Sequence, residues 1–230
     1  MYKQSPLKTS WTKFLRMEVC TMKSKVVSLG PSIIVSLAMI VIMTAAAPIA
    51  FAQASHVRWD ILNVIFGAPG MPNTLHPGGI ASATANGGSH ITLTGSGTFV
   101  APAGGNGTSS AVSGGGKWTT YSSKGDVTGT GTYEVTGLVL WEPSPLPPGN
   151  LPTPIDKIEP SDRPSTGVAV LRIAYSEGEK GILVVSCEGY LSPAFAYEGI
   201  HATKGLTDYK SPVAPIPGVN ANRTLFHVEE

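Results

Sequence analysis

The sequence predicts an all-β fold, an antiparallel barrel or sandwich of about nine strands that follows an N-terminal apolar signal helix. Short stretches of alternating or continuous hydrophobic residues recur from Ser55 to the C-terminus, and Gly- and Pro-rich turns separate them. No amphipathic helical periodicity follows the N-terminal segment. Glycines near the starts of several strands favour closure into a barrel, because they let strands bend and coil sharply.

The N-terminal segment predicts export. Residues Ile33 to Phe51 carry no charge, and two lysines stand shortly before them. Small residues around Ala52 and Ala54 supply two A-x-A sites for a signal peptidase. A basic start, an apolar core and an A-x-A exit are the layout of a secretory signal. We therefore expect residues 1–52 to be a signal peptide and the protein to be exported, either secreted or held at the cell surface.

An uncleaved membrane anchor is the alternative interpretation of this segment. The apolar run of 19 residues approaches the length that spans a bilayer. Pro48 interrupts the run near its end, which favours cleavage. The stretch before the run is long for a signal, so we expect translation to begin at Met22 or Met17. A true start at Met1 would favour the anchor.

The charge and length of the chain after residue 52 exclude some classes of function. Six Lys or Arg residues and one Glu lie before residue 53, so the overall formal charge of +1 conceals an acidic body. The 178 residues from 53 onward carry ten basic and 14 acidic side chains, with no basic run. We expect no nucleic-acid partner, and contact with a membrane only through the N-terminal segment. One all-β domain is predicted over residues 55–230, with Cys187 as a lone buried hydrophobe.

The first strand is predicted from alternation. Val57, Trp59 and Ile61 alternate with the polar residues Arg58 and Asp60. This period of two indicates a half-buried strand whose polar residues face away from the core.

A hairpin and a repeated motif are predicted next. Ile80 to Ala85 and His90 to Val100 flank an Asn-Gly turn, which supplies the positive φ that a tight hairpin requires. The pattern G-x-G-[TK]-aromatic then ends at Phe99, Trp118 and Tyr133. We expect successive strands of a meander, with each aromatic side chain packed on the core.

The longest strand is predicted from Asp126 to Trp141, with Tyr133, Val135, Val139 and Trp141 on one face. Eight prolines follow in residues 142–164, a density at which neither strand nor helix is expected. We predict a Pro-rich excursion over 142–164 that drapes across one mouth of the fold as a lid. A mobile surface loop is the alternative.

A central hairpin is predicted from Gly167 to Tyr175 and from Gly181 to Tyr190, since both arms are apolar on both faces. Arg172 interrupts the first arm. A buried arginine requires a partner, so we expect either a structural ion pair or a pocket that receives an anionic ligand. The carboxylates considered as partners are Glu134, Glu188, Glu198 and Asp208, and two further strands are predicted over residues 194–203 and 223–228.

Several blocks carry a resemblance: Gly129 to Trp141, Ala169 to Cys187, and Tyr197 to Gly205 with Asp208-Tyr209. Together they resemble small exported prokaryotic all-β proteins that have no assigned activity. The resemblance implies no catalytic residues. Barrels of the allene-oxide-cyclase and calycin type are an architectural analogy, and a fold does not determine a function.

Candidate ligand-binding residues are Arg172, Glu188, Glu198 and His201, which lie on or beside the predicted central strands. No G-x-S-x-G or H-E-x-x-H motif is present, so no catalytic set is assigned. A metal site built from His90, His201, His227 and Glu198 is a weaker alternative, and no metal or other cofactor is expected.

Two functions are consistent with these features. The first is an exported non-enzymatic β protein that binds a small apolar or anionic ligand, or a surface partner. The second is an isomerase or hydrolase whose acid–base residues are dispersed around a barrel mouth. Clustering of the four candidate residues around one open cavity would favour catalysis, whereas a filled interior would favour an interaction role. The sequence leaves the oligomeric state open.

Overall fold

The computed structural model describes residues 54–102, 108–144, 154–159, 163–189, 196–212 and 222–229. These residues form an all-β fold without a helix, so none of them forms a helix that could span a membrane. The predicted signal segment lies outside the described residues. The strands are β1 (Ser55–Ile65), β2 (Thr74–Pro77), β3 (Ala81–Ala85), β4 (His90–Leu93), β5 (Ser96–Ala101), β6 (Val112–Tyr121), β7 (Val127–Ser144), β8 (Ile155–Asp156), β9 (Arg163–Tyr175), β10 (Lys180–Cys187), β11 (Gly199–Lys204), β12 (Thr207–Pro212) and β13 (Arg223–Val228).

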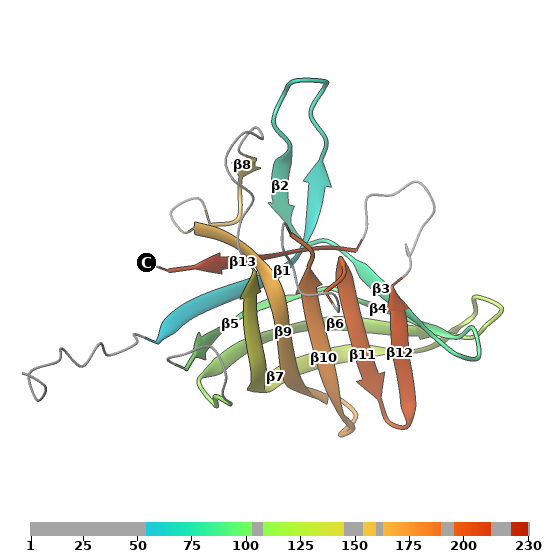
Figure 1. The fold of residues 1–230 in the computed structure, drawn as a ribbon. Coiled ribbons are helices and arrows are strands. Elements are labelled where there is room, and N and C mark those ends of the chain that lie inside the picture. The colour runs from blue at the N-terminus through green and yellow to red at the C-terminus, as the bar shows by residue number, and fades with distance from the viewer. Residues whose placement is uncertain are drawn as a thin grey trace, which may run out of the picture. The chain divides into compact units, whose positions relative to one another are not determined.

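The strands belong to one sheet in which every pairing is antiparallel except that of β2 with β8. The order along the sheet is β10-β11-β12-β3-β4-β6-β7-β9-β13-β1-β2-β8, and β5 pairs with both β1 and β6. The strand β9 also pairs with β10, the first strand in this order. The pairings from β10 through β12, β4 and β7 to β9 therefore lead back to β10. Figure 1 shows β9, β10, β11 and β12 side by side. The first and last strands are neighbours, with Val57 opposite Val228.

The structure has thirteen described strands rather than the predicted nine. One reason is that the predicted strand from His90 to Val100 is two strands. Gly95 adopts a φ of 148° between them, and β4 continues beside β3 while β5 turns to pair with β1. The predicted hairpin around Asn86-Gly87 is confirmed for β3 and β4 only.

The glycine run in β6 is explained by crowding of neighbouring backbones. The first half of β6 pairs with β5, the second half with β4, and β7 lies along its other side. A Cβ atom on Gly115 would lie 2.1 Å from the carbonyl oxygen of Tyr133, and one on Gly116 would lie 1.8 Å from that of Thr94. Only glycine permits this approach. The strand therefore serves as the point where the sheet branches.

The strand β7 is long and twice irregular. Its register with β9 shifts between Val135 and Gly137 and again between Leu138 and Leu140. Such bulges change which face a side chain occupies. Leu138 is consequently fully buried while Val139 is only half-buried. The prediction that Val139 shares the buried face of Tyr133, Val135 and Trp141 is therefore wrong for Val139, whereas the other three are buried.

The Pro-rich segment contains more regular structure than predicted. The strand β7 continues to Ser144 and β9 begins at Arg163, because prolines 143 and 164 lie at strand ends where fewer ladder hydrogen bonds are needed. Between them, β8 pairs with β2: the N–H of Ile155 donates to the carbonyl of Asn73 over 2.8 Å. The described part of the excursion is thus hydrogen-bonded to the sheet. Residues 145–153 and 160–162 of the segment lie outside the described residues, so the predicted lid is not tested.

The central hairpin is confirmed, but its two faces differ. Leu171 and Ile173 of β9 and Leu183 of β10 are fully buried, whereas Val170 is half-buried and Arg172 is exposed. The predicted burial of Arg172 is therefore wrong. The apolar sequence predicted that both faces of the hairpin would be covered by other parts of the protein, but only one face packs against the main core.

The core is filled by large side chains from nearly all strands. The aromatic residues predicted from the repeated motif, Phe99, Trp118 and Tyr133, are all buried in it. Trp141 of β7 packs against Phe99 and against Phe226 of β13, with ring centroids 5.5 Å and 4.5 Å apart. Cys187 is buried at the end of β10, as predicted.

Candidate functional site

The four predicted site residues occupy three separate places. Arg172 projects from β9 on the face that turns away from the core. Glu188 and Glu198 lie together, because the Glu198 carboxylate accepts a hydrogen bond from the N–H of Glu188 over 3.3 Å. His201 lies on β11 with a different partner. The structure therefore does not bring the four together.

His201 pairs with Asp208 of the next strand. Its Nε2 atom lies 2.6 Å from a carboxylate oxygen of Asp208, and both side chains are partly exposed. Asp208 was a candidate partner for Arg172, but the pairing of β11 with β12 places it near His201 instead. This is a solvent-facing cross-strand pair of the kind that contributes little to stability.

A shallow depression of about 500 Å³ surrounds Arg172 on the outer face of β9 and β10. In the strand register, Arg172 lies opposite Ile182, and Ala174 lies opposite Lys180. Directly opposite residues in an antiparallel pair point to the same face, so the two cations flank an apolar floor. The full lining is Thr136, Arg172, Ile173, Ala174, Lys180, Gly181, Ile182 and Thr203.

Neither cation of this depression is neutralised by a neighbour. Within the described part of the chain, Arg172 and Lys180 form no hydrogen bond or ion pair through their side chains, and both are exposed. The basic residue Lys204 differs, since it contacts both Glu177 and Glu179. The depression consequently presents two unpaired positive charges beside an apolar surface.

Glu198 is a carboxyl group in a largely dehydrated position. Burial raises its pKa to about 7, against the smaller lowering effects of the N–H of Thr224 and the charge of Arg223. The hydrogen bond from Thr224 to the carboxylate measures 2.8 Å. Burial likewise raises the pKa of the neighbouring Cys187 thiol, which keeps it protonated and unreactive.

This environment predicts a pH-dependent stability. A carboxyl whose pKa is raised in the folded state stabilises the fold while it is protonated, and this contribution is lost as the pH rises through the folded value. We expect unfolding free energy to fall between pH 4.5, the ordinary value, and about 7. In Glu198→Gln this decrease of unfolding free energy with pH should disappear. Urea unfolding of both proteins at a series of pH values tests this. An unchanged slope would contradict the assignment.

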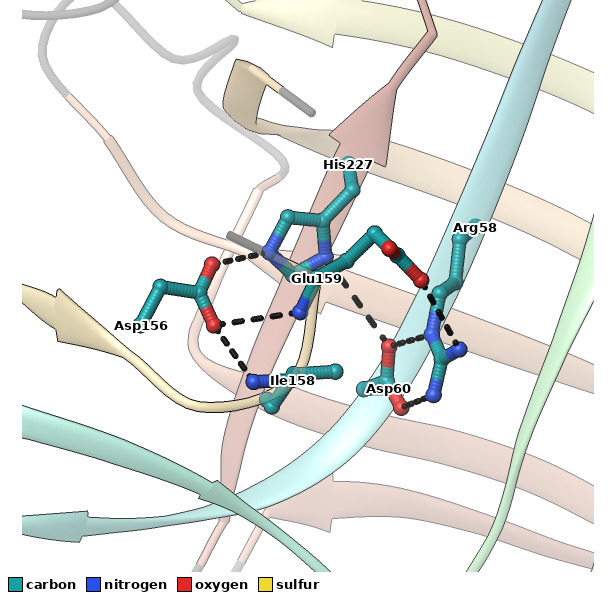
Figure 2. A network of polar contacts seen from close by, with 6 residues as sticks. All are labelled: Arg58, Asp60, Asp156, Ile158, Glu159 and His227. Atoms are coloured by element: carbon teal, nitrogen blue, oxygen red, sulfur yellow. Dashed lines mark hydrogen bonds and ion pairs between the residues drawn. The ribbon is translucent and has the colours of Figure 1, made fainter. Parts of the chain in front are cut away.

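A second polar cluster, which the sequence analysis missed, lies where β1, β8 and β13 meet (Figure 2). The guanidinium of Arg58 donates two hydrogen bonds to the Asp60 carboxylate, over 2.8 Å and 3.0 Å. A third contact joins Arg58 to Glu159 at 3.5 Å. Alternation in β1 predicted that Asp60 would face solvent, but its side chain is only 2% exposed.

Burial of Asp60 follows from coverage by distant segments. His227 of β13 is fully buried, and its Nδ1 atom lies 4.0 Å from the Asp60 carboxylate. Its Nε2 atom lies 2.6 Å from the carboxylate of Asp156 in β8. A histidine is thus held between two carboxylates, one from the first strand and one from the Pro-rich segment. The sequence offered no local signal for this, since the participants lie up to 169 positions apart, from Arg58 to His227.

The backbone fixes the orientation of Asp156. Its carboxylate accepts hydrogen bonds from the N–H groups of Ile158 and Glu159, over 2.7 Å and 3.4 Å (Figure 2). Burial tends to raise the pKa of Asp156, but these bonds and the contact with His227 outweigh it and the pKa lies below its ordinary value. The contacts of Asp156 with His227 and of Glu159 with Arg58 fasten β8 and the residues after it to β13 and β1.

The histidines of the proposed metal alternative do not converge. His90 stacks on Tyr121 with centroids 4.4 Å apart, while His201 and His227 pair with the separate aspartates described above. Across the described ranges, no group of three or more His, Cys, Asp or Glu side chains has an arrangement that could hold a metal ion. No protein-family model, curated protein or solved structure matches this chain.

Proposed function

We propose that this chain is an exported, non-enzymatic β protein that binds a small ligand with an anionic group and an apolar part. The binding site is the depression between Arg172 and Lys180. The observation that carries the proposal is the pair of exposed cations that lack partners in the described structure, set beside Ile182 and Ala174.

The chemistry of these side chains defines the ligand class. Arginine presents a planar set of donors that matches a carboxylate or phosphate, and lysine adds a second positive charge. The apolar surface between them favours a hydrocarbon portion, which would lose contact with water on binding. A carboxylate that carries a short aliphatic chain therefore fits both features.

The packing of the core supports binding at the surface rather than in an internal cavity. Core positions of β3, β4, β9, β10 and β11 are occupied by fully buried side chains that contact one another. The alternative of an isomerase or hydrolase at a barrel mouth needs Arg172, Glu188, Glu198 and His201 around one opening. Their separate positions favour the binding role.

We also propose that the sheet is a closed barrel rather than a sandwich. The supporting observation is the circuit of pairings in which β9 contacts β7 on one side and β10 on the other. A sandwich would leave edge strands between its two layers. The export of the chain remains part of this proposal and rests on the apolar segment before residue 52.

The ligand proposal is tested with octanoate as the probe and octanol as its uncharged counterpart. Octanoate should shift backbone amide resonances of β9 and β10, and Arg172→Gln should weaken binding about tenfold, because a charge-assisted hydrogen bond is lost. Lys124→Gln, in the turn before β7, removes the same charge elsewhere and should bind as the parent does. Equal binding of octanol, or unchanged affinity in Arg172→Gln, would contradict the proposal.

A further inference from the structure

The β1–β2 hairpin projects from the sheet and ends in a tip, residues 65–73, with unusually exposed large hydrophobic side chains (Figure 1). Ile65 and Phe66 are each 59% exposed and Met71 is 63% exposed. In contrast, Ile61 and Leu62 at the base of the same strand are fully buried. Hydrophobic exposure is therefore confined to the end of the hairpin that lies farthest from the core.

A neighbouring strand extends the apolar surface of the tip. Ile65 pairs with Thr74, which in turn pairs with Ile155 of β8. Directly paired residues share a face of the sheet, so Ile155, which is 45% exposed, lies in the same row as Ile65. Large exposed hydrophobic side chains gathered at one end of a hairpin mark a region that meets an apolar phase or a partner.

The charge pattern favours a lipid surface over a protein. No Asp, Glu, Lys or Arg occurs between Asp60 and Lys117, so the part of the hairpin in which β1 and β2 pair, together with its tip, contains none of these residues. Lys157 is exposed just beyond Ile155, and the guanidinium of Arg223 lies 6.0 Å from the Phe66 ring centroid. An uncharged apolar end with cations behind it matches a bilayer, which has a hydrocarbon interior beneath phosphate groups.

The nearby acidic groups do not oppose this arrangement. Asp156 is bound to His227, and Glu159 contacts Arg58, so both carboxylates turn toward the body of the protein (Figure 2). Two backbone N–H groups of the tip have hydrogen-bond acceptors within it. The N–H of Met71 donates to the carbonyl of Ala68, over 2.8 Å. The N–H of Gly67 donates to the side chain of Asn73 over 3.2 Å. Internal hydrogen bonds lower the cost of moving a loop out of water.

We propose that the β1–β2 tip inserts into the interfacial region of a lipid bilayer, with Phe66 and Met71 as its principal contacts. This surface is independent of the anionic-ligand depression and of the N-terminal apolar segment, which precedes the opposite end of β1. It differs from the sequence-based expectation that only the N-terminal segment contacts a membrane. The flanking Lys157 and Arg223 then lie at the level of the lipid phosphates.

A fluorophore at position 71 tests insertion directly. The test uses the exported form of the chain with Met71→Cys, and the new cysteine is labelled with nitrobenzoxadiazole. If the protein used still contains Cys20, that residue is replaced by Ser. Cys187 stays unlabelled because it is buried. With vesicles of phosphatidylcholine and phosphatidylglycerol, emission should shift to the blue and nitroxide lipids should quench it. A label at Leu206→Cys, in the fully exposed turn between β11 and β12, is the control and should show neither change.

A charge at the tip supplies the second test. Phe66→Asp should weaken vesicle binding, or the quenching of the label at position 71, by about tenfold or more. Leu206→Asp adds the same charge at another exposed hydrophobic residue and should leave both unchanged. If labels at positions 71 and 206 respond alike, or Phe66→Asp has no effect, the proposal is overturned. Energy transfer between chains without vesicles, abolished by Phe66→Asp while lipid quenching is absent, would identify a second copy as the occupant and would also overturn it.

Discussion

Replacement of Trp141 by Ala should lower the free energy of unfolding by about 3–5 kcal/mol, the cost of removing a large aromatic side chain from a packed core. Trp141 is 3% exposed and contacts the rings of Phe99 and Phe226. These rings come from β5, β7 and β13, so the substitution leaves a cavity where three strands meet. The loss of unfolding free energy within this range depends on how far neighbouring side chains collapse into the cavity.

Urea unfolding measured by circular dichroism tests this result. Trp141→Phe retains an aromatic ring and should lie between the parent and the alanine variant. Leu206→Ala serves as the control, because Leu206 is fully exposed and its replacement should change the free energy of unfolding by less than about 0.5 kcal/mol. A loss below about 1 kcal/mol in Trp141→Ala would mean that the aromatic cluster does not join these strands.

Neutralisation of Asp60 has the second large expected effect. Asp60→Asn should destabilise the fold by about 3 kcal/mol, because Arg58 loses its bidentate partner and the buried His227 loses a facing carboxylate. The side chain of Arg58 is 32% exposed, so its charge regains contact with water when Asp60 is neutralised. The expected loss therefore lies at the lower end of the range for broken buried ion pairs.

A surface pair provides the matched comparison for Asp60→Asn. Glu177 contacts Lys204 with its side chain 37% exposed, and Lys204 keeps Glu179 when Glu177 is neutralised. Glu177→Gln should therefore cost less than about 1 kcal/mol. Both variants are measured by urea unfolding at neutral pH. Equal losses in the two variants would show that Asp60 is not held in a water-poor site.

Local sequence patterns predicted several features that the structure confirms. The aromatic residues of the repeated motif, Phe99, Trp118 and Tyr133, are in the core, and the hairpin of β9 and β10 forms as expected. The burial of Cys187 was also predicted. These features depend on short-range periodicity and turn chemistry, which a single sequence contains.

Features that depend on distant segments were missed. Asp60 alternates with buried residues and resembles a solvent-facing position, but His227 and the segment around Asp156 cover it. The bulges of β7 moved Leu138 into the core, and a bulge has no reliable pattern in the sequence. Similarly, the pKa of Glu198 depends on the distant residue Thr224 and on burial, neither of which sequence spacing can give.

The pairing of the first strand with the last has a consequence for how the chain acquires its structure. Because Val57 pairs with Val228, the sheet is incomplete until residues 223–228 are available. Pairings between residues so far apart carry a large loop-closure cost before they contribute stability, and such topologies fold slowly. During synthesis, β1 therefore has no β13 to pair with. A sheet that closes only when β13 is available suits the proposed export, because a translocation channel admits an unfolded chain.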